Sequence, residues 1–148
     1  MPSLVIRLAS IVALVLFTAP AAQAASAKAL FESYGLLGTF AVDCQRPVGP
    51  GNPYLYFRAL NGGDVGIELW ATPQARQYAY VIDRAQARGR DEISISMANE
   101  RQRLNLLYRV EGRRLRTMES AREGGSPIVI GGVFVENRAP TPWFTKCA

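Results

Sequence analysis

The carboxylates are the first side chains of this chain that could do chemistry. The acidic candidates are Asp43, Asp64, Glu68, Asp83, Asp91 and Glu92. Paired-acid catalysis needs two carboxylates held at a defined separation, and no two of these residues have a spacing that predicts two acids in one site. Most of them fall in predicted turns or at outward strand positions, which favours a solvent-facing role over catalysis.

Histidine and cysteine chemistry is narrowly limited. The chain has no histidine, which excludes Ser-His-Asp and Cys-His catalysis and every zinc site that needs an imidazole. Its two cysteines, Cys44 and Cys147, are predicted to form a disulfide, as is usual in an oxidising compartment. Two free thiols or a bridge between two chains are the alternatives. With the cysteines paired, the sequence predicts no metal site, no cofactor and no enzymatic activity.

Aromatic residues form the main candidate binding set. They gather on neighbouring predicted strands, and the set comprises Tyr54, Tyr56, Trp70, Tyr78, Tyr80 and Trp143. Aromatic walls with a few hydroxyls suit a small apolar ligand in the mouth of a barrel. The alternative is that such rings fill the interior of a small barrel themselves.

Arginines are concentrated between residues 101 and 122. Arg103 and Arg109 share the outward face of one predicted strand, and Arg114 and Arg116 belong to the next. Together these four predict a positive strip that would bind a phosphate or a carboxylate. The alternative is a solvated outer face balanced by nearby acids, which are Glu100, Glu111, Glu119 and Glu123.

Residues 1–24 have the features of a cleaved signal peptide. Arg7 supplies a positive charge, an apolar stretch runs from Leu8 to Phe17, and Ala22-Gln23-Ala24 has the small residues that a signal peptidase requires. The apolar stretch is shorter than the ~20 residues of a spanning helix. The sequence therefore predicts a periplasmic or secreted domain over residues 25–148 with no membrane span. The net charge of +5, which falls to +4 without Arg7, is modest and predicts no nucleic-acid partner.

The elements that must position these side chains are mostly strands. A short amphipathic helix is predicted from about Ala27 to Tyr34, with Gly35 as its stop. From Thr39 onward apolar residues recur at every second position, most clearly in "DEISISM". About eight or nine short strands with turn residues between them, and no long crossover helix, predict an antiparallel meander.

The two cysteines decide whether this meander closes. A meander must close or leave two exposed edges. Disulfide geometry brings two Cα atoms to about 5.5–6 Å, which fits adjacent strands. A bridge from Cys44 on the first strand to Cys147 on the last makes those strands neighbours. The predicted fold is therefore an all-β single domain, an antiparallel meander closed into a barrel of about eight strands, with a short N-terminal helix.

The opening of the first strand, Gly38-Thr39-Phe40, carries a family resemblance. A helix, this tripeptide, about eight strands and a disulfide to the C-terminus resemble the lipocalins and wider calycins, whose signature is Gly-x-Trp. Phe40 stands where that family has tryptophan. The resemblance implies a lipocalin-like barrel and a basic residue, Lys146 or Arg138, across the signature aromatic. The strings "GLLGTFAVDCQRP" and "WFTKC" also resemble small uncharacterised exported proteins of proteobacteria.

Two functions are expected from these features. The first is a non-enzymatic, monomeric periplasmic binding module that holds a small apolar ligand or docks on an envelope partner. The second is a protein–protein module, either an assembly factor or a protease inhibitor, because periplasmic inhibitors of secreted metalloproteases are similar in size and barrel form. Its contact would be the segment Ala25 to Tyr34 or the loop Gln45 to Pro53.

Overall fold

A computed structural model describes residues 25–148, and the predicted signal peptide lies outside the described residues. The elements in chain order are α1 (Ala27–Ser33), β1 (Gly38–Ala41), β2 (Tyr54–Ala59), the 3-10 turn η1 (Asn61–Gly63), β3 (Val65–Trp70), β4 (Arg76–Ala87), β5 (Glu92–Ala98), β6 (Arg103–Glu111), β7 (Arg114–Arg122), β8 (Pro127–Ile130), β9 (Val133–Phe134) and β10 (Trp143–Lys146). Over the described residues, no helix is long and apolar enough to cross a membrane.

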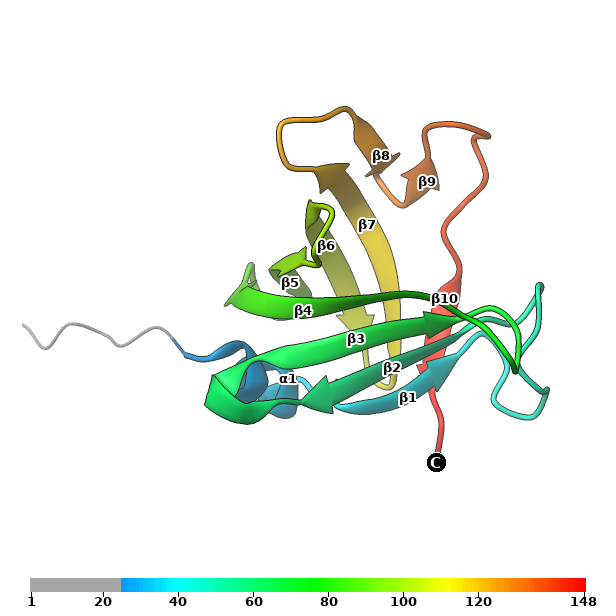
Figure 1. Cartoon of the computed structure of the whole chain (residues 1–148), viewed down its shortest axis with the longest axis horizontal. Helices are drawn as coiled ribbons and strands as arrows, with labels where there is room; N and C mark the ends of the chain where they lie inside the picture. The colour runs from blue at the N-terminus through cyan, green and yellow to red at the C-terminus, as the bar shows by residue number, and fades with distance from the viewer. Residues whose placement is uncertain (1–24) are drawn as a thin grey trace, which may run out of the picture.

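Eight of the strands close into a barrel (Figure 1). Every strand from β1 to β8 pairs antiparallel with the next strand along the chain, and β10 pairs both with β1 and with β7. In the closing register Phe40 lies opposite Lys146, and Phe144 lies opposite Leu115. The ring therefore consists of β1 to β7 and β10. The predicted antiparallel meander, its closure into a barrel and its short N-terminal helix are confirmed.

On the side away from β6, strand β7 pairs with two different strands along its length. Its first residues pair with β10, whereas Ser120 lies opposite Val129 of β8. Strands β8 and β9 form a hairpin around Gly131 and Gly132, whose φ values of 59° and 77° are ones that glycine adopts readily. This hairpin extends the sheet beyond the ring, where Figure 1 shows it above β7.

Helix α1 covers one end of the barrel. The Ser26 hydroxyl accepts a hydrogen bond from the Ala29 amide at 3.1 Å and caps the first turn. Phe31 is fully buried, and its ring centroid lies 5.3 Å from that of Phe57. At the other end of the helix the Lys146 ammonium donates to the Gly35 carbonyl at 2.7 Å. The helix is thus fixed against β2 and β10 and plugs this end.

The barrel interior is a packed hydrophobic core. Alternation turns one side of every strand inward, and the largest side chains with exposed fractions below 2 % include Phe40, Ile67, Ile82, Ile93 and Leu115. Phe57 lies at the centre, with ring centroids 5.7 Å from Phe40 and 6.3 Å from Tyr108. Rings and branched side chains from both walls of the barrel therefore meet across its middle.

The predicted Cys44–Cys147 disulfide is present, with Cα atoms 5.4 Å apart. Its position differs from the expected one, because Cys44 lies beyond the end of β1. The strand stops early since the Asp43 carboxylate accepts a hydrogen bond from the Gln45 amide at 2.9 Å and so forms a turn. The bridge therefore joins the ends of two neighbouring strands, and the Cys147 amide adds a 2.8 Å hydrogen bond to the Thr39 carbonyl.

Candidate functional site

The six aromatic residues singled out in the sequence lie on two faces of the barrel. Tyr78 and Tyr80 point inward, with ring centroids 5.4 Å apart. The other four lie on the outer face: Tyr54, Tyr56, Trp70 and Trp143. Burial of Leu55 and Phe57 forces the alternating tyrosines of β2 outward. The structure thus brings Tyr78 and Tyr80 together, and the six residues do not line a single chamber.

Tyr78 and Tyr80 belong to a groove along an unpaired part of β4. Strand β4 pairs with β3 from Arg76 onward, but with β5 only from Val81, which lies opposite Ala98. Among the described residues, Arg76–Tyr80 therefore has a strand partner on one side only. We call the hollow beside it the β4 groove. Its volume is about 810 Å³, and the lining residues used below are Arg58, Glu68, Arg76, Ala79, Asn99 and Gln102.

A chain of hydrogen bonds fixes the far wall of the β4 groove. The Arg122 Nε donates to the Gln102 side-chain oxygen at 3.0 Å, and the Gln102 Nε2 donates to the Tyr80 hydroxyl at 2.5 Å. The Asn99 side-chain oxygen accepts from the amides of Arg101 and Gln102 and shapes the turn between β5 and β6. This wall is therefore tied to both β4 and β7.

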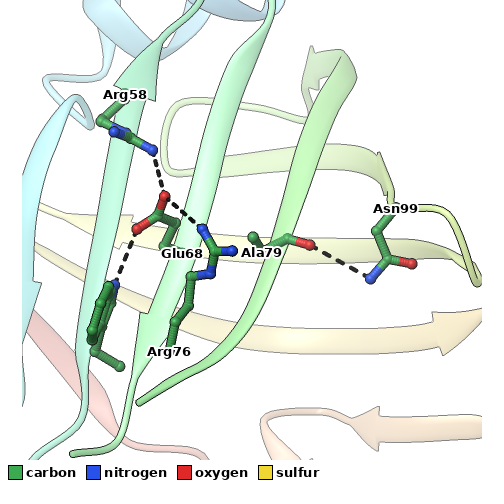
Figure 2. A network of polar contacts seen from close by, with 6 residues as sticks. Arg58, Glu68, Arg76, Ala79 and Asn99 are labelled. Atoms are coloured by element: carbon green, nitrogen blue, oxygen red, sulfur yellow. Dashed lines mark hydrogen bonds and ion pairs between the residues drawn. The ribbon is translucent and has the colours of Figure 1, made fainter. Parts of the chain in front are cut away.

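An ion-pair cluster forms the near wall (Figure 2). The Glu68 Oε1 accepts from Arg58 and, at 3.3 Å, from Arg76. Its Oε2 accepts from the Trp70 indole N–H at 3.0 Å. Glu68 is 15 % exposed and meets donors at both oxygens, so it acts as an ion-pair acceptor. Since two guanidinium groups share one carboxylate, this wall keeps one surplus positive charge.

The other acidic candidates that meet arginines are separated from one another. Asp83 pairs with Arg103 at 2.9 Å, and that hydrogen bond holds the pKa of the Asp83 carboxyl below its usual value. Glu92 pairs with Arg109 at 2.8 Å on another part of the wall. In the part of the chain that the structure describes, no group of three or more Cys, Asp or Glu residues could hold a metal ion.

The buried tyrosines make stability depend on alkaline pH. Burial, and then the neighbouring Tyr80, raises the pKa of Tyr78 to about 12, and burial followed by Tyr78 also raises the pKa of Tyr108. The folded state therefore holds these phenolic protons more tightly than the unfolded chain, in which tyrosine titrates near pH ~10. We expect full stability from this source below pH ~10 and a steady loss as pH rises toward ~12.

The measurement is the urea midpoint at several pH values across this window, for the parent and for Tyr78→Phe. The variant should show a shallower decline, because it lacks one of the two raised pKa values. A midpoint that stays constant across the window, or an equally steep decline in the variant, would contradict the assignment.

The four arginines of the predicted strip do not form one free patch. Arg109 lies opposite Arg116, and Arg114 and Arg116 approach the Trp143 ring at 4.8 and 5.9 Å. Arg103 is separate, on Asp83. The grouped arginines already have protein partners: Arg114 donates to Glu111, and Arg116 donates to the Gly132 carbonyl and the Thr141 hydroxyl. Trp143 lies among these arginines, and sequence reasoning missed this grouping.

Two further hollows lie on the surface. One of about 490 Å³ covers the outer face of β5 to β8 beside the exposed Ile130. The other, of about 680 Å³, lies between Ala25 and the Asp83 region of β4. Neither combines a polar wall, aromatic rings and unpaired backbone as the β4 groove does. The β4 groove is therefore the candidate site.

Lys146 lies on β10, the strand that closes the barrel. It lies opposite Phe40 in the sheet register and is bonded to Gly35. Arg138, the other basic residue considered for that place, lies in the loop after β9 and has a φ of 60°.

Comparisons with protein-family models, with curated proteins and with solved structures return no match for this chain.

Proposed function

We propose that this protein is a non-enzymatic binding module of an oxidising extracytoplasmic compartment, and that it docks on a partner protein through its surface. The observation that carries the proposal is the packed interior. Phe31 from the helix and Phe57 from β2 occupy the centre that a small apolar ligand would need. The Cys44–Cys147 bridge supports the oxidising compartment.

A surface site suits a protein partner better than a small molecule. Small-molecule sites usually bury most of the ligand inside a concave pocket, whereas the three hollows described above are open to solvent. A partner protein covers ~800 Å² of each surface and can close an open groove by its own bulk. Binding of a small apolar ligand is the alternative function.

The contact regions first considered for an inhibitor are less favoured. The segment Ala27–Ser33 forms α1, and Phe31 anchors it in the core. The loop before β2 is held from inside by Asn52, whose amide donates to the Asp43, Arg46 and Pro47 carbonyls. Neither region can extend into a partner without losing these contacts, so the open grooves are the preferred surfaces.

Photo-crosslinking in the native host tests the proposal. A photoreactive phenylalanine analogue would replace one exposed residue at a time: Gln77 at the β4 groove, Ile130 on β8 and Glu136 after β9. We expect a discrete protein adduct at one of these positions and none at the others. Absence of an adduct at all three, together with a lipid-sized mass bound in native mass spectrometry, would favour the small ligand and overturn the proposal.

A further inference from the structure

The half of β4 that lacks a partner on one side offers an open sheet edge. The Ala79 carbonyl points away from β3 toward the β5 side, since the Asn99 side-chain amide donates to it. In an antiparallel strand the N–H and C=O of one residue point to the same side. The Ala79 N–H therefore also points into the β4 groove, and β5 begins to pair only two residues later, at Val81.

Asn99 occupies the place that a partner strand would take. Its amide nitrogen lies 3.5 Å from the Ala79 oxygen, at the outer limit of a hydrogen bond. A side-chain amide carries the same donor and acceptor groups as a peptide unit. An incoming backbone N–H could replace this long bond with a shorter one. The exchange would leave the Asn99 turn intact, because the Asn99 side-chain oxygen would keep its hydrogen bonds from the Arg101 and Gln102 amides.

Apart from the Asn99 side chain on Ala79, neither a bulge nor a charged side chain blunts the stretch Tyr78 to Tyr80. Natural edges are blunted by bulges or charged residues, and here the irregularity between Leu69 and Trp70 places its extra residue at the start of β4, beside Arg76. Ala79 is small, and it lies opposite Glu68 on β3. The stretch from Tyr78 to Tyr80 is therefore regular, and among the described residues it has no strand partner on its open side.

The two faces of the edge indicate the chemistry of the occupant. Toward the outside an added strand meets Arg76, whose guanidinium shares the Glu68 carboxylate with Arg58, so this face keeps a surplus positive charge. Toward the inside it meets the rings of Tyr78 and Tyr80. Because successive side chains of a strand point to opposite faces, the favoured segment alternates acidic and apolar residues. A second copy of the chain would instead bring the same positive surplus against itself.

We propose that Arg76–Tyr80 of β4 is a docking edge at which an extended partner segment of alternating acidic and apolar residues adds as a further strand. The proposal rests on the proposed function and names its site. Backbone hydrogen bonds supply the attachment, and the charge and ring surfaces select the sequence. The Ala79 N–H and C=O are the central pair of groups in this contact.

The test is an NMR titration of the full protein, ¹⁵N-labelled, with two blocked six-residue peptides. One alternates glutamate with valine, and the other replaces each glutamate by lysine. The acidic peptide should shift the Ala79 amide signal, slow its hydrogen exchange at least tenfold and bind at least tenfold more tightly than the basic peptide. Absence of these changes, or equal binding of the two peptides, would overturn the docking edge.

Two controls isolate strand addition. Ala79→Pro removes an N–H that faces the groove and not β3, so the amide signals of β3 should stay in place while binding falls at least tenfold. The second control uses the parent protein, so it does not depend on how that variant folds. An acidic peptide that is N-methylated at alternate residues should bind the parent as weakly as the unmodified peptide binds Ala79→Pro. Undiminished binding in this second control would contradict strand addition.

The outcomes separate this inference from the function on which it rests. Crosslinks at Ile130 or Glu136, with an unresponsive Ala79 amide, would refute the β4 edge and leave a protein-docking module. Absence of a protein adduct at all three positions, together with a lipid-sized bound mass, would refute both.

Discussion

Replacing Cys44 and Cys147 together by serine is expected to lower the free energy of unfolding by about 3–5 kcal/mol. The bridge joins residues 103 positions apart. The chain-entropy model gives ~4.7 kcal/mol for a loop of ~100 residues, because the cross-link restricts the unfolded chain. Strand β10 has four residues and is the strand that closes the barrel, so its pairing should loosen first. Urea unfolding of the oxidised parent and of the double variant measures the difference.

Reduction supplies the matched control for this substitution. The parent treated with a reducing agent should unfold at the midpoint of the double serine variant, since both lack the cross-link. Hydrogen exchange of the Cys147 amide, which bonds the Thr39 carbonyl, should accelerate on reduction. A double variant within ~1 kcal/mol of the oxidised parent would show that the bridge does not hold the closing strand.

Phe57→Ala is expected to cost about 3–5 kcal/mol of unfolding free energy. The Phe57 ring is 2 % exposed and meets Phe31, Phe40 and Tyr108. Its removal leaves a void bounded by the helix and by strands on both walls, so the surroundings cannot collapse onto it without moving α1. The same urea measurement gives the loss.

The neighbouring residue provides the comparison for the core substitution. Tyr56 alternates with Phe57 on β2 and faces outward, next to the Tyr54 ring. Tyr56→Ala should therefore cost less than ~1 kcal/mol, as is usual for surface positions. Equal losses at the two positions would mean that the inward and outward faces of β2 are assigned the wrong way round.

Most of the architecture could be predicted from local sequence patterns and one covalent constraint. Apolar alternation such as Ile93, Ile95 and Met97 identified the strands, and Gly35, with a φ of 65°, ends the helix as its position predicted. The pairing of two distant cysteines was enough to predict closure. The division of β7 between β10 and β8 could not be predicted, because it depends on register between distant segments.

The candidate site was less predictable, for the same reason. Composition identified the aromatic residues, and the alternation of Tyr56 with Phe57 already contained the information that places the tyrosine outside. The grouping of Trp143 with Arg114 and Arg116 arises from the pairing of β10 with β7. The open edge at Ala79 depends on where β5 ends relative to β4, a length difference that no single motif encodes.

An NMR titration with lauric acid, kept below its micelle concentration, tests most directly whether the interior is a packed core and binding belongs to the surface. The amide signals to follow are those of Ile67, Ile93 and Leu115, three residues that line the centre of the barrel. We expect these signals to stay in place while any shifts are confined to surface positions. Saturable one-to-one shifts at all three would show that the interior admits a ligand, and would contradict the account.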